Sequence, residues 1–99
     1  MIAIVWEFIV KDEAVSAFLQ AYGPHGEWVA LFRQHPGYDG TSLLRDTTTR
    51  GRFLTIDRWE TEAQFNQMHQ ASQQEYSRLD ALFGELMASE RKVGVFVAV

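Results

Sequence analysis

Four stretches of the chain carry the hydrophobic pattern of β-strands. Residues 2–10, IAIVWEFIV, are dense in β-branched and aromatic side chains and predict a strand that is apolar on both faces except at Glu7. Residues 53–59, FLTIDRW, predict another strand, in which every second side chain points to the same face. One of its faces holds Phe53, Thr55, Asp57 and Trp59. Shorter runs predict strands over 41–46 and 93–99.

Helical spacing separates these strands. Apolar residues three and four positions apart predict a helix that Asp12 caps, and a second helical piece over 24–34 follows a Gly-Pro break. Two further helices are expected over 61–71 and 73–88. Capping boxes open both of them, at Thr61-Glu-Ala-Gln64 and Ser72-Gln-Gln-Glu75.

The resulting order, β-α-β-β-α-β, predicts an α+β fold of the ferredoxin-like type, in a single domain over residues 1–99. Such a fold is an antiparallel sheet that carries its helices on one face. The first and last strands are apolar on both faces, so the bare face would expose a large apolar surface to water. Packing two such sheets face to face removes this exposure, and we therefore expect a homodimer through the sheet face.

Charge and composition narrow the classes of function. The formal net charge is −4 and the nine Lys and Arg residues are scattered, which argues against nucleic-acid binding. The absence of Cys excludes disulfides, thiolate nucleophiles and thiolate metal sites. The first residues carry no basic leader, and no apolar run is long enough to span a bilayer. We expect a cytoplasmic protein with no membrane partner.

Several short motifs occur at defined positions in the predicted order of strands and helices. The third strand ends in DRWE, residues 57–60, and a capped helix with Phe65 and then His69 follows it. HPGY, residues 35–38, precedes the second strand. In these features and in its length, nearly the whole chain resembles the antibiotic biosynthesis monooxygenase (ABM) family. The resemblance implies a dimeric α+β barrel.

The same resemblance implies a choice of activities. Members include cofactor-independent oxygenases of aromatic polyketides, quinol oxygenases, haem-degrading enzymes and proteins of no known activity. Haem-degrading members use an Asn on the first strand and a helical Trp and His, whereas Asn66 is the only Asn here and Met68 stands where the Trp is expected. The polyketide oxygenases place Trp, Asn, Tyr and Arg around an aromatic substrate. Trp59 matches the strand-end Trp, and no residue matches the Asn.

Trp59 and Asp57 share one face of the third predicted strand. The Trp59 indole is suited to stack on a planar aromatic ligand, and its alternative role is packing at a sheet corner. If the face is covered, Asp57 becomes a desolvated base that can deprotonate a phenol or hydroquinone. Its alternative is an ion pair with a neighbouring Arg such as Arg45. On the opposite face, in the expected dimer, Arg58 is expected to pair with Glu7 of either subunit.

The remaining candidates lie on the predicted helices. His69 is a candidate proton shuttle near neutral pH, or else a solvated histidine at a helix edge. Tyr76 is a candidate hydrogen-bond donor to a ligand carbonyl, or else half-buried core. The segment YGPHGEW suggests a lid that carries His25, with Trp28 and Phe32 lining a pocket beneath it, or else a kinked helix with a packing Trp.

We expect a pocket in each subunit that binds a small planar aromatic or quinol-type compound. The leading reaction is oxygenation without a cofactor or metal, with Asp57 or His69 as the base. The alternatives are a non-catalytic binding or stress-response dimer of the same fold and, less favoured, haem degradation. The three His residues have no spacing typical of a metal site.

Overall fold

The computed structural model describes the whole chain, Met1–Val99. Its helices and strands are β1 (Ile2–Val10), α1 (Val15–Tyr22), α2 (Glu27–Phe32), β2 (Tyr38–Arg45), β3 (Arg52–Trp59), α3 (Glu62–Ala71), α4 (Gln73–Phe83) and β4 (Met87–Val97). Short 3-10 turns precede α1, at Asp12–Ala14, and follow α4, at Gly84–Leu86. None of the helices combines the length and the apolar character needed to cross a membrane.

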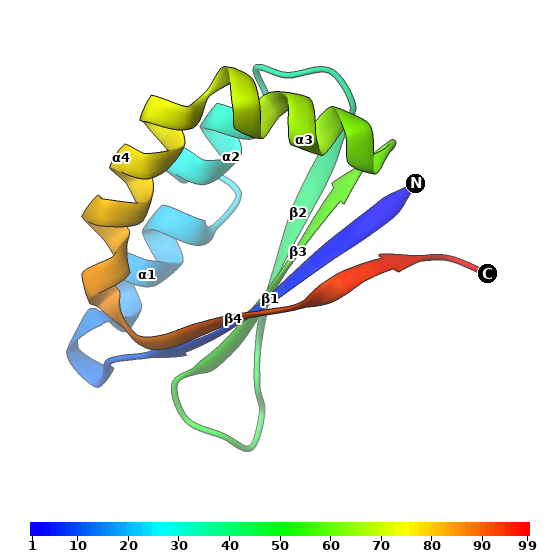
Figure 1. Ribbon diagram of the computed structural model, residues 1–99. Coiled ribbons are helices and arrows are strands. Elements are labelled where there is room, and N and C mark those ends of the chain that lie inside the picture. The colour runs from blue at the N-terminus through cyan, green and yellow to red at the C-terminus, as the bar shows by residue number, and fades with distance from the viewer.

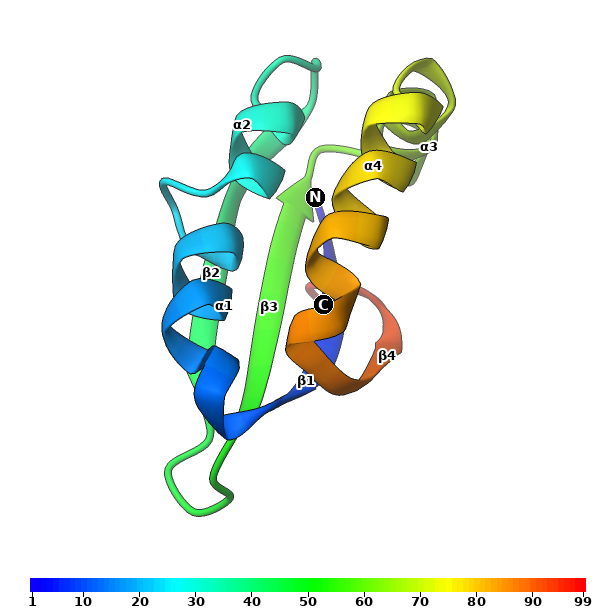
Figure 2. The ribbon, with the colours of Figure 1, turned by 90° about the vertical axis from the view of Figure 1, so that its left-hand side faces the viewer.

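The four strands form one antiparallel sheet in the order β2-β3-β1-β4. All the helices lie on one side of the sheet and leave the other side bare (Figure 1). Seen from the helical side, α1 with α2 and α3 with α4 form two columns, with β3 visible between them (Figure 2). The predicted ferredoxin-like α+β fold is confirmed.

The alternation predicted for β3 places its polar residues on both faces of the sheet. Phe53, Thr55, Asp57 and Trp59 are buried under the helices, and the residues between them point to the bare face. The antiparallel register sets Asp57 beside Ile4 of β1 and Thr41 of β2. An aromatic core, in which Phe18 and Tyr22 stack with ring centroids 4.6 Å apart, fills the space below α1.

The boundary between the last helix and the last strand differs from the prediction. The helix was expected to run to residue 88 and the strand to begin at 93, but α4 ends at Phe83 and β4 begins at Met87. Hydrogen bonding to β1 makes a strand of the polar stretch 89–92, whose side chains alone do not favour one. This longer β4 carries Glu90 and Lys92 onto the helical side.

The break between α1 and α2 is where the Gly-Pro pair predicts it, but α2 is shorter than expected. It begins only at Glu27 and ends at Phe32. Gly26 is required just before it, because a Cβ atom there would lie 2.1 Å from the Ala21 carbonyl oxygen. Strand β2 begins at Tyr38, three residues before its predicted start.

Of the three predicted N-caps, only one forms. The Thr61 hydroxyl accepts a hydrogen bond from the Gln64 backbone N–H at 3.2 Å. Asp12 is not a cap, because Lys11 occupies the N-cap position and makes no side-chain bond. Ser72 does not cap α4 through its side chain, because its hydroxyl instead bonds His35 Nε2 at 2.9 Å.

The bare face of the sheet combines apolar residues with a network of ion pairs. Its apolar residues include Val5, Ile9, Leu44, Leu54, Ile56 and Phe96. Arg52 joins Glu7 at 2.7 Å and Asp46 at 2.8 Å. Within the subunit, the expected pair between Arg58 and Glu7 does not form, because Glu7 is held by Arg52 and Arg91, and Arg58 donates to Ser42 Oγ at 3.0 Å.

Candidate functional site

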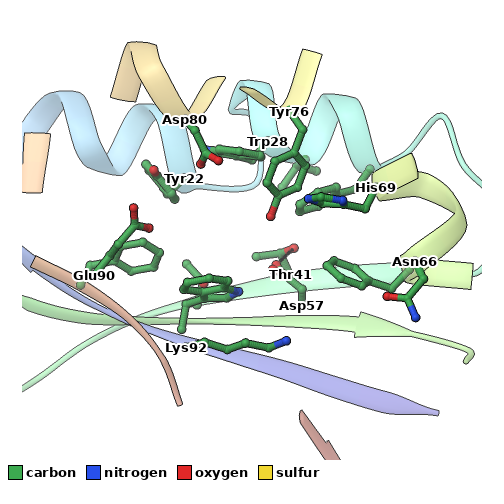
Figure 3. A pocket seen from close by; sticks show the side chains of 16 residues that line it. Tyr22, Trp28, Thr41, Asp57, Asn66, His69, Tyr76, Asp80, Glu90 and Lys92 are labelled. Atoms are coloured by element: carbon green, nitrogen blue, oxygen red, sulfur yellow. Dashed lines mark hydrogen bonds between the residues drawn. The ribbon is translucent and has the colours of Figure 1, made fainter. Parts of the chain in front are cut away.

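A cavity of about 530 Å³ lies between the covered face of the sheet and the helices. Seven of its 16 lining side chains are Trp, Phe or Tyr, namely Trp6, Phe8, Tyr22, Trp28, Phe32, Phe65 and Tyr76. The polar groups that face it are Thr41, Thr55, Asp57, Asn66, His69, Asp80, Glu90 and Lys92 (Figure 3). The fold therefore brings together residues from all four strands and all four α-helices.

Asp57 is the most deeply buried charged group of this wall, with 8% of its surface exposed. Its Oδ1 accepts a hydrogen bond of 2.7 Å from the Thr41 hydroxyl, and Oδ2 has no hydrogen-bond partner in the chain. No cation pairs with it: Arg45, the alternative partner, lies over the Phe53 ring at 5.5 Å from its centroid. Asp57 thus has a single neutral partner.

Desolvation controls the ionisation of Asp57. Burial raises the pKa of its carboxyl from 3.8 to about 6, while the Thr41 hydrogen bond and the Arg58 charge act in the opposite direction. The group is therefore ionised at neutral pH and is a stronger base than an exposed aspartate. An unpaired carboxylate at an aromatic cavity wall is suited to accept a proton from a bound molecule.

Tyr76 and His69 meet above Asp57 on the helical side. Their rings make an edge-to-face contact with centroids 4.4 Å apart, and the Tyr76 hydroxyl points down into the cavity (Figure 3). Burial raises the pKa of this phenol, and the Asp80 and Asp57 carboxylates act in the same direction. Tyr76 therefore stays protonated and available as a donor. His69 is exposed at the edge of the cavity.

Trp28 and Phe32 of α2 line the cavity, as the pocket prediction requires. Trp28 packs edge-to-face on Tyr76, with centroids 4.9 Å apart. The structure does not bring His25 to the site: it is exposed in the link between α1 and α2 and does not line the cavity.

Trp59 is also absent from the cavity wall, although the sequence makes it the leading ligand contact. The side chain is 0% exposed. Phe32, Tyr38 and Phe65 pack against it with ring centroids 5.3–5.8 Å away, so no face of the indole is free for a ligand. Its Nε1 has no hydrogen-bond partner. The structure thus places Trp59 behind the wall, where it supports the aromatic residues in front.

Two further carboxylates and one cation face the cavity at its exposed end. Asp80 of α4 and Glu90 of β4 approach it from opposite sides, and Lys92 lies below (Figure 3). Partial burial raises the pKa of both carboxyls, and the Asp80 charge adds to this effect at Glu90. No cluster of three or more His, Asp or Glu side chains has an arrangement that could hold a metal ion.

Several residues of this wall were not predicted from the sequence. Thr41 lies beside Asp57 because the register of the β2–β3 hairpin pairs the two residues. Glu90 and Lys92 were not predicted to face the cavity, because the last strand was expected to begin only at residue 93. Trp6 and Phe8 share a strand face, and this alternation was the available signal for them.

The family model described as antibiotic biosynthesis monooxygenase matches residues 1–76. No curated protein matches the chain. Among solved structures, SnoaB, a cofactor-independent oxygenase from Streptomyces nogalater, has 21% sequence identity and a TM-score of 0.72, over 99% of this chain and 92% of that one. A conserved protein of unknown function from Bacteroides thetaiotaomicron has 14% identity and a TM-score of 0.75, over 96% and 94% of the two chains. The TM-scores show that these proteins share the fold, and at such low sequence identities they show the fold alone.

Proposed function

The chain belongs to the antibiotic biosynthesis monooxygenase family, and on this premise we propose that it is a cofactor-independent monooxygenase of a small planar aromatic or quinol-type compound. The buried carboxylate of Asp57 at the wall of the aromatic cavity carries the proposal. The fold shared with SnoaB, a cofactor-independent oxygenase, supports it. A volume of about 530 Å³ is in the range of small-molecule sites.

The proposed reaction starts with proton transfer to Asp57. With an anthrone as substrate, the carboxylate removes a proton from the ring CH₂ group and leaves a delocalised carbanion. The carbanion passes one electron to dioxygen, and the two radicals combine to form a carbon–oxygen bond. The peroxide is protonated and its O–O bond breaks as the second C–H proton leaves. One oxygen atom remains in the product as a ketone, and the other departs in water.

The other cavity residues would bind and orient the substrate. Trp28 and Phe32 offer apolar faces to a planar ring system. The Tyr76 hydroxyl, held protonated by burial, would donate to the oxygen on which negative charge develops. His69, at the exposed edge, is placed to return a proton to the peroxide intermediate.

We also propose that the protein works as a homodimer joined through the bare sheet face. Val5, Leu54 and Ile56 lie side by side in the middle of this face, and Leu44 and Phe96 are among its exposed residues. A continuous apolar patch of this kind is typical of a protein–protein contact. A second copy offers the same patch, because a two-fold interface uses the same residues on both subunits.

Oxygen uptake tests the proposed activity. Chelator-treated protein is mixed with anthrones, hydroquinones and flavonols in an oxygen electrode, with Asp57→Asn as the variant and Asp39→Asn as the control, since Asp39 is exposed on β2. We expect uptake that requires the protein, is lost in the Asp57 variant and persists in the control. A ligand that binds to the protein without oxygen uptake would instead support the non-catalytic binding dimer.

A further inference from the structure

Asp57 is the inner end of a hydrogen-bonded chain that leads from the cavity along the covered face to the edge of the sheet. The Thr41 hydroxyl donates to Asp57 Oδ1 at 2.7 Å. The Tyr38 hydroxyl lies 2.7 Å from the same Thr41 oxygen and donates to it, because the Thr41 proton is already used. The three oxygens form an unbroken path from a buried carboxylate to a half-buried phenol.

The path runs from the inside of the sheet to its edge. Asp57 lies on β3, which has a neighbouring strand on each side, whereas Thr41 and Tyr38 lie on β2, an edge strand. Tyr38 is the first residue of that strand and does not line the cavity. A proton that reaches its hydroxyl has therefore left the space that a substrate would fill.

We propose that Thr41 and Tyr38 form a proton relay that carries the proton taken up by Asp57 to solvent at the edge of the sheet. The inference rests on the proposed role of Asp57 as the base. A bound aromatic molecule would block the direct way from Asp57 to the mouth of the cavity. The relay lets the base be regenerated while the substrate is still bound.

In each transfer, one proton enters the relay at Asp57 and one proton leaves it at Tyr38. The proton arrives on Asp57 Oδ2, which has no partner, and the carboxyl group then turns about its Cβ–Cγ bond to place the O–H beside Thr41. The Thr41 and Tyr38 hydroxyls first rotate, so that Thr41 donates to Tyr38 and Tyr38 donates to water. The Asp57 O–H bond then breaks as a new bond forms to Thr41 Oγ1, the former Thr41 proton moves to the Tyr38 hydroxyl, and the former Tyr38 proton passes to water. This transfer leaves both hydroxyls donating towards Asp57, as before.

Other groups around Asp57 are placed differently. Tyr76 of α4 and His69 of α3 face it across the cavity, on the substrate side, and Lys92 of β4 lies below them (Figure 3). Arg58 follows it on β3 but points to the opposite face, where it donates to Ser42. Of its neighbours, only Thr41 is hydrogen-bonded to Asp57, so the relay has one entrance.

The test measures proton exchange at Asp57 directly. ¹³C relaxation dispersion of the labelled Asp57 carboxyl, recorded near its pKa of about 6, reports the rate at which it exchanges protons with water. A saturating non-oxidisable probe, 9,10-anthraquinone-2-methanol, is included to fill the cavity. Thr41→Val and Tyr38→Phe remove one hydroxyl each and keep the shape of the side chain. Ser42→Ala, which removes a hydroxyl from the opposite face of the same strand, is the control.

We expect exchange to slow by about tenfold or more in both variants and to be unchanged in the control. Added imidazole should restore the rate in Tyr38→Phe, and Thr41→Ser, which keeps the hydroxyl, should exchange like the original protein. Loss of the Thr41 donor should also raise the pKa of Asp57 further, because this hydrogen bond lowers it. If Thr41→Val fails to fold, Tyr38→Phe and Thr41→Ser decide the question alone.

Exchange as fast in Tyr38→Phe as in the original protein would overturn the relay. This readout does not depend on turnover, so the two proposals can fail separately. Slow exchange in the variants with no oxygen uptake by any form would keep the relay and remove the monooxygenase. Oxygen uptake that requires Asp57 together with unchanged exchange would keep the monooxygenase and remove the relay.

Discussion

Asp46 and Asp57 belong to the same β-hairpin, yet the structure gives the two carboxylates opposite properties. Asp46 accepts hydrogen bonds from the backbone N–H groups of Thr48 and Thr49, from the Thr48 hydroxyl and from Arg52. These donors hold the pKa of Asp46 well below its usual value. Asp57 has one hydroxyl donor, and burial raises its pKa to about 6.

The difference shows what turns a carboxylate into a candidate base. Asp46 stabilises the loop and the ion pairs on the bare side of the sheet, and every donor that holds it makes it a weaker base. Asp57 lies under the helices, where most of its contact with bulk water is lost and no cation compensates for the loss. The covering helices, more than the residue type, therefore decide which of the two can do chemistry.

Asp57→Asn is the change with the largest expected effect. Removing the base should lower the rate of the proton-abstraction step by about 10²–10⁴-fold, as for other general bases. Steady-state oxygen uptake measures the loss, and the same substitution at Asp46 is the comparison. Equal activity of the Asp57 and Asp46 variants would contradict the assignment of the base.

A charge introduced on the bare face of the sheet tests whether this face forms the proposed dimer contact. Ile56→Lys places a cation in the middle of the apolar patch that the proposed dimer would bury. Burying a charge without a partner is costly, so light scattering should report a halved mass. Leu82→Lys, at a side chain of α4 that is 51% exposed, should leave the mass unchanged. A monomeric original protein would rule out the dimer.

Ionisation of Asp57 should destabilise the fold as pH rises, whereas ionisation of most aspartates stabilises it. Its pKa is about 6 in the folded state and 3.8 ordinarily, so the folded protein binds the proton more tightly. The free energy of unfolding should therefore fall as pH rises from about 4 to 6. Asp57→Asn removes this dependence and should stabilise the protein at pH 7 by about 2–3 kcal/mol.

Urea denaturation at several pH values measures this effect. The free energies of unfolding of the original protein and of the Asp57 variant should be equal near pH 4 and should differ increasingly towards pH 7. An Asp57 variant that is less stable than the original protein at pH 7 would show that the carboxylate is stabilised by its surroundings, against the raised pKa.

Asp46→Asn should have the smallest effect, and of the opposite sign. Because the pKa of Asp46 is lowered in the folded state, its stabilisation is present above the ordinary value of 3.8 and is lost as pH falls below it. We expect a fall in Tm of a few degrees at pH 7 that disappears in acid, with oxygen uptake unchanged. Differential scanning calorimetry at both pH values measures it, and a Tm difference that grows in acid would contradict the lowered pKa.

Most of the fold follows from local patterns in the sequence. The alternation in FLTIDRW is enough to place Asp57 under the helices, and the Gly-Pro pair marks the break between α1 and α2. The start of β4 could not be read in this way, because the polar segment 89–92 is held in the sheet by its pairing with β1. Pairing between distant segments leaves no local signal.

The site was predicted less completely than the fold. Asp57, Tyr76 and His69, which line the cavity, were proposed because their residue types carry chemistry, and Trp59 was proposed for the same reason. Its position behind the wall depends on how three aromatic rings from different elements pack around it. The role of Thr41 depends on strand register, which loop length alone does not fix to the residue.

The distribution of the three indoles gives the protein a built-in optical reporter. Trp6 and Trp28 face the cavity, whereas Trp59 is sealed from solvent behind it. A quinone-like molecule in the cavity would contact the first two and quench their fluorescence more strongly than that of the third. The fall in the total emission would then follow occupancy of the cavity without any added label.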